Sequence, residues 1–276
     1  MQTAQSKFIW LLIVGFLFIP IGLYPLFDLD EGNFTQATRE MLQRSDWMTP
    51  YLHGFIRTDK PIFIHWLQIL STKIWGFNEF GFRFPSASAG LLWLYTIYRF
   101  VKQRLGEQVS IDAVLFALGS LLFTVITKAA TADAVLNLFL CISLMSMWQY
   151  FEYKNQSSLL MCFAAIGLGF LTKGPVAIVV PLVVSFVYFV CHGHASFWLK
   201  SICNFRGWLI MLSLALPWYI YQYYVNGTEF LSGFIMHHNI ERFSRPFEGH
   251  SGNISYYIIV LIFSTLPLTR LVLPLF

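Results

Sequence analysis

The segment Asp28-Leu29-Asp30-Glu31-Gly32-Asn33 brings three carboxylates together directly after an apolar run that ends at Phe27. The chain has only 14 acidic residues among 276, so this clustering needs a physical explanation. A carboxylate that faces lipid is energetically costly, and we therefore expect the segment at a membrane surface or in a water-filled cavity. There it either ends a helix or takes part in chemistry.

The composition indicates an all-α polytopic membrane protein. Hydrophobic residues make up 57% of the chain and charged residues 12%, whereas soluble domains are about 45–50% apolar and about 25% charged. Aromatic residues reach 18%, which suits lipid-facing surfaces and interfacial belts. The small net charge of +4 and the lack of a basic run interleaved with aromatics argue against nucleic acid as a partner.

The cysteines and the N-terminus point to structural roles. The cysteines have no CxxC spacing and lie in or beside apolar runs, so we expect them to pack in the core; they are Cys141, Cys162, Cys191 and Cys203. The N-terminal apolar run follows Lys7 and has no small-x-small cleavage pattern. This pattern predicts an uncleaved signal-anchor.

Apolar segments recur along the chain at about the 20-residue length that a spanning helix needs. The first covers about residues 8–27 and contains Pro20 and Pro25, which favour a kink or an early end. Together with the later segments it predicts a bundle of about eight transmembrane helices in a single domain over residues 1–276. The later segments lie at about 84–100, 111–127, 134–151, 158–171, 175–191, 207–224 and 254–270. The chain then ends in apolar sequence, which predicts either a C-terminal truncation or a short final anchor.

The polar stretch 28–80 is predicted to form an outer loop with amphipathic helices at the membrane surface. Asn33 can cap a helix over about residues 34–44, with Glu40 on its polar face. Pro61 suits the first turn of a second helix, which we expect to continue to about residue 75.

The charges of the connections predict the orientation of the bundle. The short connections on one side are basic, and the positive-inside rule places them inside; they hold Arg99, Lys102, Arg104, Lys154, Lys200 and Arg206. Residues 28–80 and 226–253 then form two loops on the outer side. The clusters around residues 57–61, 128–133 and 171–175 lie on the same side. Solvated loops without a function would not be sorted in this way.

The carboxylates Asp30 and Glu31 have two readings. They are either the solvated end of a helix, or a general base or metal ligand at the mouth of a cavity. Neighbouring carboxylates raise one another's pKa, which helps one of them to accept a proton near neutral pH.

Three further charged residues of the outer side also have two interpretations each. Lys60 either forms a surface ion pair with Asp59 or holds a phosphate beside a helix N-terminus. Lys173 either extends to the lipid headgroups or contacts a ligand. Asp133 either caps the helix that follows it or lines a site.

The region from His237 to His250 is the second dense polar cluster. One of His237 and His238 could bind a metal together with a carboxylate, and Arg242 or Arg245 could hold a phosphate through two hydrogen bonds. A plain solvated loop is the alternative.

These motifs, in this order, resemble the bacterial polyprenyl-phosphate-sugar-dependent glycosyltransferases of the GT-C fold. The nearest subgroup is the lipid A 4-amino-4-deoxy-L-arabinose transferase type, which is related to the protein O-mannosyltransferases. The resembling stretches cover nearly all of the chain: residues 30–33, 39–42, 46–50, 59–61, 83–87, 131–133, 171–175, 217–219, 239–243 and 248–250.

The resemblance implies roles for single residues. Asp30 would be the catalytic acidic residue, with Glu31 as a second candidate, and Lys60, Arg242 and Lys173 would contact the carrier phosphate. Asp59 stands where the aminoarabinose transferases have a glutamate linked to a divalent metal, with His237 or His238 as its partner. The remaining candidates for substrate binding are Asp133, Arg57, Glu248 and His250.

The resemblance also implies a function. The chain would move a sugar from undecaprenyl phosphate to lipid A or a similar envelope acceptor, on the periplasmic side of the bacterial inner membrane and without a nucleotide cofactor. A protein O-glycosyltransferase is the alternative within enzymes. A lipid or sugar flippase is the alternative of another class, and it would place charged residues at mid-membrane depth. Family members carry further spans and a soluble outer domain.

Overall fold

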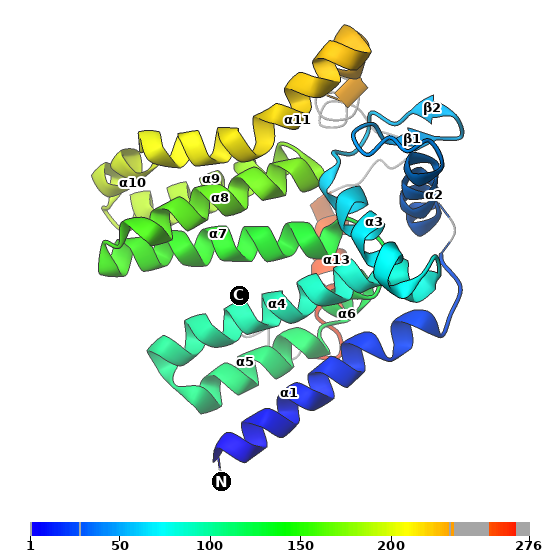
Figure 1. Cartoon of the computed structure of the whole chain (residues 1–276). Coiled ribbons are helices and arrows are strands. Elements are labelled where there is room, and N and C mark those ends of the chain that lie inside the picture. The colour runs from blue at the N-terminus through cyan, green and yellow to red at the C-terminus, as the bar shows by residue number, and fades with distance from the viewer. Residues whose placement is uncertain (1, 28, 232, 235–253, 269–276) are drawn as a thin grey trace.

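The computed structural model describes residues 2–27, 29–231, 233–234 and 254–268, and the fold is a bundle of helices with two short helices and a hairpin at one end (Figure 1). The bundle contains the long helices α4 (Glu79–Leu105), α7 (Asp133–Tyr153), α8 (Gln156–Lys173) and α11 (Phe205–Leu231). These four pack in the order α4, α7, α8, α11, each against the next. Around them lie α1 (Gln2–Phe18), η1 (Pro20–Gly22), α5 (Glu107–Gly119), α6 (Leu121–Thr127), α9 (Val176–Cys191), α10 (Ala195–Ile202) and α13 (Ile254–Ser264).

Within the described residues, length and composition qualify two helices, α7 and α8, as membrane spans. The count rises to four if the bent pairs α5–α6 and α10–α11 each form one span. The apolar stretches Ser6–Gly22 and Val176–Cys191 are shorter. Several span candidates therefore confirm the all-α membrane fold, while the number of eight crossings stays a prediction.

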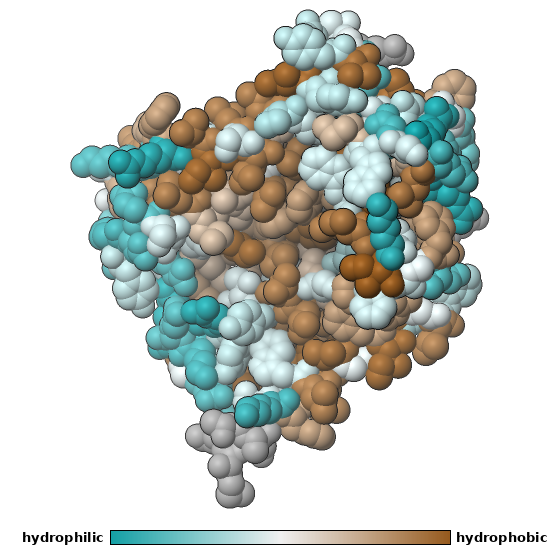
Figure 2. Space-filling view, in the orientation of Figure 1, coloured by the Kyte–Doolittle hydropathy of each residue, from teal (hydrophilic) through white to brown (hydrophobic). Residues whose placement is uncertain are grey.

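The hydrophilic residues gather at the two ends of the bundle (Figure 2). In this view one hydrophilic region covers the connections α4–α5 and α7–α8, and the other covers α2 (Asp30–Gln43) and the hairpin β1 (Tyr51–Leu52) and β2 (Phe55–Ile56). A broad hydrophobic region separates them, as expected for a belt that faces lipid. The end that holds α2 and the hairpin is called the outer end below.

Two boundaries differ from the sequence prediction. The predicted span 111–127 is divided at Ser120 into α5 and α6, which are bent by 73°. The hydroxyl of Ser120 donates to the Ser264 carbonyl over 2.7 Å, and the Leu121 N–H donates to the Leu266 carbonyl over 3.0 Å. The bend thus depends on a segment more than a hundred residues away, which hydropathy cannot reveal.

The first outer-loop helix begins at Asp30, so the prediction that Asn33 caps a helix from residue 34 is wrong. Asn33 lies in the first turn, where Asp30 and Glu31 complement the positive end of the helix dipole. Glu40 was also expected on the polar face, yet it is buried. The hairpin turn 53–54 packs over it, and its carboxylate accepts hydrogen bonds from the N–H groups of that turn. Burial alone would raise the pKa of Glu40. These bonds and one from Gln36 nevertheless hold the pKa below its ordinary value.

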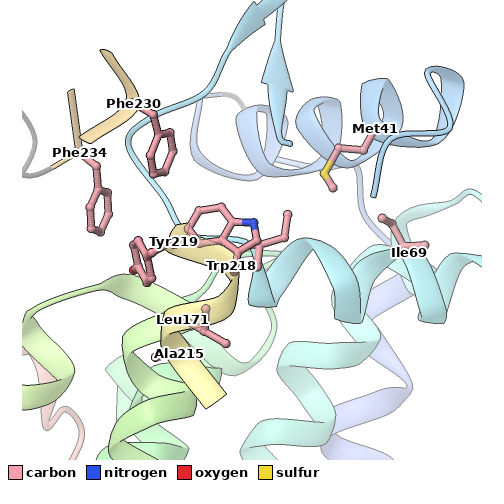
Figure 3. Close-up of a cluster of buried hydrophobic side chains, with 9 residues drawn as sticks. Met41, Ile69, Leu171, Ala215, Trp218, Tyr219, Phe230 and Phe234 are labelled. Atoms are coloured by element: carbon pink, nitrogen blue, oxygen red, sulfur yellow. The ribbon is translucent and has the colours of Figure 1, made fainter. Parts of the chain in front are cut away.

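One apolar cluster fastens the outer loop to the bundle (Figure 3). It joins α2, α3 (Phe63–Trp75), α8 and α11 through Met41, Ile62, Ile69, Leu171, Ala215, Trp218, Tyr219, Phe230 and Phe234. Figure 3 shows the rings of Trp218, Tyr219, Phe230 and Phe234 grouped together. The indole N–H of Trp218 donates to the Met48 carbonyl over 2.8 Å, and Gln222 donates to the same oxygen over 2.6 Å.

Replacing Trp218 by Ala tests this attachment. Because Trp218 is 2% exposed, removal of its ring opens a cavity and leaves the Met48 carbonyl with only the hydrogen bond from Gln222, at an expected cost of about 3–5 kcal/mol. The free energy of unfolding of the full-length protein in detergent should fall accordingly. Trp75→Ala is the control, since that ring is 47% exposed, and an equal loss in both variants would contradict the attachment.

Candidate active site at the outer end

Glu31 and Arg83 form a fully buried ion pair, with side chains that are 1% and 0% exposed. Both oxygens of Glu31 accept from the guanidinium, over 2.8 Å from Nε and 2.7 Å from Nη2. They also accept the N–H groups of Phe27, over 2.7 Å, and Ala130, over 2.5 Å. The carboxylate therefore connects the end of the first span, the helix α4 and the connection before α7.

Every N–H group of the Arg83 guanidinium is used. Besides its bonds to Glu31, it donates to the carbonyl of Ile21 over 2.9 Å and to those of Tyr24 and Pro25 over 2.8 Å. These three carbonyls lie in η1 and in the irregular segment that follows it, and Arg83 supplies their hydrogen-bond donors. A buried pair of this kind is stable only with such complete hydrogen bonding.

The connection of residues 128–132 is fixed by further side chains. Gln68 of α3 donates to the Ala130 carbonyl over 3.1 Å, and the Ser86 hydroxyl donates to the Thr131 carbonyl over 3.2 Å. The Tyr24 hydroxyl donates to the Lys128 carbonyl over 3.1 Å. Side chains from three separate parts of the chain thus hold the segment that leads into Asp133.

Asp133 and Lys173 form an ion pair at the outer end of α7 and α8. The Thr131 hydroxyl also donates to the Asp133 carboxylate, over 3.2 Å. Asp133 is the first residue of α7 and makes no capping bond, so the capping reading is wrong. Both side chains of the pair are about one-third exposed, at 36% for Asp133 and 31% for Lys173, and a ligand at this end of the bundle can reach them.

Arg57 holds the Asp59–Lys60 segment against the first turn of α2. Its guanidinium donates to both oxygens of Asp59, over 2.6 and 3.1 Å, and to the Asn33 carbonyl over 2.9 Å. It also lies 4.5 Å from the ring centroid of Phe34. The side chain is only 5% exposed, which sets it apart from a residue that binds substrate directly.

Lys60 is positioned by Asp59. Its Nζ lies 3.5 Å from Asp59 Oδ2, and its side chain is 17% exposed. The ion pair expected as the plain reading is therefore present, but Asp59 is at the same time held by Arg57. The arrangement fixes the position of a lysine close to the start of α2.

Asp30 differs sharply from its neighbour Glu31. It is exposed at the first position of α2, and its side chain makes no hydrogen bond or ion pair with any residue that the structure describes. Its carboxylate can therefore meet a substrate, whereas both oxygens of Glu31 are already engaged. Asp28 lies outside the described residues.

His65 is a buried neutral residue of α3 that the sequence analysis did not single out. Its Nδ1 lies 2.8 Å from the hydroxyl of Thr38, which donates to Gln68 over 2.6 Å. Burial, together with the positive charge of Arg57, lowers the pKa of His65 to about 3. Gln68 and Arg83 were likewise missed as site residues, although Arg83 opens one of the stretches on which the resemblance rests.

The described residues do not fit a metal site. They contain no group of three His, Cys, Asp or Glu side chains that could hold an ion. Both oxygens of Asp59 accept from Arg57, which leaves this carboxylate poorly suited as a ligand. The other residues expected in the site lie outside the described part of the chain; they are His237, His238, Arg242, Glu248 and His250.

The model of the family described as "Dolichyl-phosphate-mannose-protein mannosyltransferase" matches residues 59–221, which is more than half of the chain. The chain belongs to this family of membrane glycosyltransferases. The match includes Asp59, Lys60, Arg83, Asp133 and Lys173, so most of the described site lies within it.

Among curated relatives, the undecaprenyl phosphate-alpha-4-amino-4-deoxy-L-arabinose arabinosyl transferase of Aeromonas hydrophila is 30% identical over 94% of the chain and 48% of its own length. The enzyme of that name from Wigglesworthia glossinidia brevipalpis is 28% identical over 92% of the chain and 46% of its own length. The chain thus spans about half the length of these relatives.

A solved structure confirms the GT-C fold. ArnT from Cupriavidus metallidurans bound to undecaprenyl phosphate superposes with a TM-score of 0.91 at 23% identity, over 98% of this chain and 50% of that one. Its apo state gives a TM-score of 0.89. The fold and the family expected from the ordered motifs are therefore confirmed.

Replacing Glu31 by Gln should strongly destabilise the protein, because it leaves the Arg83 charge buried without a counter-ion. We expect a loss of about 3–5 kcal/mol in the free energy of unfolding. Glu152→Gln, in an ion pair with Arg104 near the other end, is the matched control, and it should cost at most about 1 kcal/mol. Similar losses in the two variants would contradict the scaffold role of Glu31.

His65 should make stability depend on pH. Because its pKa is about 3 in the folded state and about 6.5 when unfolded, the unfolded chain binds the extra proton first as the pH falls. Between pH 6.5 and pH 5 the free energy of unfolding should therefore fall by about 2 kcal/mol. His65→Gln should be less sensitive over this range in thermal melts, whereas His192→Gln, at an exposed position, should follow the unmodified protein. Parallel pH profiles for all three would contradict a buried neutral His65.

Proposed function

We propose that the protein transfers a sugar from a polyprenyl phosphate, of the undecaprenyl type, to an acceptor at the outer end of the bundle. The observation that carries this proposal is the placement of Asp30, exposed and without a partner among the described residues, beside a scaffold that also positions Lys60. The family match, and relatives whose names specify undecaprenyl phosphate donors, support the same donor class.

The chemistry follows from the charges. The acceptor oxygen forms a bond to the anomeric carbon of the sugar while the bond from that carbon to the phosphate oxygen breaks. Asp30 takes the proton from the acceptor hydroxyl as general base. Lys60, Lys173 and Arg242 stabilise the negative charge that develops on the departing polyprenyl phosphate. In this proposal Glu31 and Arg57 position these groups and do not touch the substrate.

Lipid A or a similar envelope lipid is the proposed acceptor, because the relatives named above are aminoarabinose transferases. The description of the family model favours the second candidate, a hydroxyl of a protein side chain. The two proposals share the donor and the site, and they differ only in the acceptor. Purified full-length protein offered lipid A and a serine-rich acceptor peptide in parallel would separate them.

The outer end is proposed to face the periplasm, on the outer side of the bacterial inner membrane. The basic residues Lys154, Lys200 and Arg206 lie at the opposite end, as the positive-inside rule requires. A transporter is less well supported, because Asp30, Lys60 and the Asp133–Lys173 pair belong to the outer ends of their helices and connections and not to mid-membrane depth.

Labelling tests this orientation. A cysteine introduced at Ser45, which is exposed beside the hairpin, should react with a membrane-impermeant maleimide in cells whose outer membrane has been permeabilised. A cysteine introduced at His192, exposed near the other end, should react only after lysis. A background without the native cysteines is needed, and the reverse labelling pattern would overturn the orientation.

Replacing Asp30 by Asn removes the proposed base without disturbing a described contact. Transfer by the full-length protein, measured as release of undecaprenyl phosphate in the presence of acceptor, should fall by about 10²–10⁴-fold. Membrane insertion should be unchanged, and the free energy of unfolding should fall by no more than the helix-dipole contribution of about 0.3–1 kcal/mol. Asp112→Asn, an exposed carboxylate of α5, is the matched control and should keep full activity. Full transfer by the Asp30 variant would refute the assignment.

A further inference from the structure

At the outer end, one exposed basic residue of α2 and one of α3 each contact an aromatic ring. In each case the ring lies just after the other helix in the sequence. Arg39 of α2 places its guanidinium carbon 5.3 Å from the ring centroid of Phe77, which follows α3. Lys73 of α3 places Nζ 4.0 Å from the ring centroid of Trp47, which follows α2. Because the contacts are reciprocal, they join the two helices into one surface, called the Arg39–Lys73 surface below.

The positive charge of this surface is not cancelled by nearby carboxylates. Neither Arg39 nor Lys73 forms an ion pair with a residue in the described part of the chain. Glu40 is turned inward to the hairpin amides, and Asp46 accepts the N–H groups of Met48 and of the residue after it. The surface is therefore attractive to an anion.

A groove of about 440 Å³ lies on this surface, lined by Arg39, Leu42, Gln43 and Phe77. The guanidinium of Arg39 and the amide of Gln43, one helical turn apart on α2, can donate several hydrogen bonds to phosphate oxygens. Leu42 and Phe77 are the apolar residues of the lining. The groove thus combines the donors that a phosphate needs with a surface suited to the glycerol and upper acyl part of a lipid.

The apolar residues around Lys73 indicate that the anion belongs to a membrane lipid. Leu70 and Ile74, one helical turn apart on α3, are 53% and 73% exposed on either side of Lys73 in the sequence. Exposed apolar side chains beside a lysine are typical of a helix that lies in the headgroup region, with the ammonium extended to the phosphates. A free phosphate ion would gain nothing from these apolar neighbours.

We propose that the Arg39–Lys73 surface docks the phosphate headgroup of an anionic phospholipid in the leaflet that covers the outer end. The inference goes beyond the transfer reaction and does not depend on it, since it needs only that the bundle lies in a membrane. It assigns to this face of α2 and α3 a lipid site separate from Asp30 and Lys60.

Lipid retention tests the proposal. The full-length protein is exchanged into detergent micelles that contain equal amounts of phosphatidylglycerol and phosphatidylcholine, is purified again, and its bound lipids are quantified by mass spectrometry. The variant Arg39→Gln/Lys73→Gln should retain phosphatidylglycerol several-fold less well, because each basic residue near an anionic surface strengthens binding roughly fivefold. The charge-conserving variant Arg39→Lys/Lys73→Arg should retain it as the unmodified protein does. Thermal melts check that all three proteins are folded.

Three outcomes would overturn the proposal. The first is an unchanged lipid ratio in the glutamine variant. The second is an equal loss in the glutamine and the charge-conserving variants, which would show that charge is not the basis of binding. The third comes from competition with inorganic phosphate. If the same phosphate concentration displaces phosphatidylglycerol from the unmodified protein and from the glutamine variant, the two basic residues do not form a specific headgroup site.

Discussion

The buried pair of Glu31 and Arg83 is the interaction on which the outer end depends. It joins the end of the first span, the first turn of α2, the helix α4 and the connection before α7 through hydrogen bonds that use every N–H group of the guanidinium. The attraction within such a pair offsets the desolvation of both charges only when the remaining donors and acceptors are hydrogen-bonded. Because the partners come from four parts of the chain, the pair ties these segments together.

Two adjacent carboxylates have opposite environments in the structure. Glu31 is enclosed by its partners, while Asp30, one residue earlier, faces outward. The same division recurs further along the chain, where Arg57 is buried and holds Asp59, which in turn contacts the more exposed Lys60. In each case a buried residue fixes the position of a more exposed neighbour, which is the support that a preorganised site requires.

The long apolar runs and the motif order were sufficient to predict the family and most helices. For α7 the sequence predicted residues 134–151 and the helix spans Asp133–Tyr153, because hydropathy and flanking polar residues are local signals. The break at Ser120 and the Asp133–Lys173 pair could not be predicted, since each depends on packing between distant segments. The burial of Glu31 depends on an arginine 52 residues later, so its charge alone suggested catalysis.

The contrast between Asp30 and Glu31 implies that substitutions at two adjacent positions should differ in their effect on protein abundance. A change at Glu31 leaves the buried Arg83 charge without a counter-ion, and the loss of stability should expose the protein to cellular quality control. A change at Asp30 removes no side-chain contact that the structure describes, so the amount of protein in the membrane should stay close to normal. A survey of variants scored by abundance alone would therefore single out Glu31 and pass over Asp30.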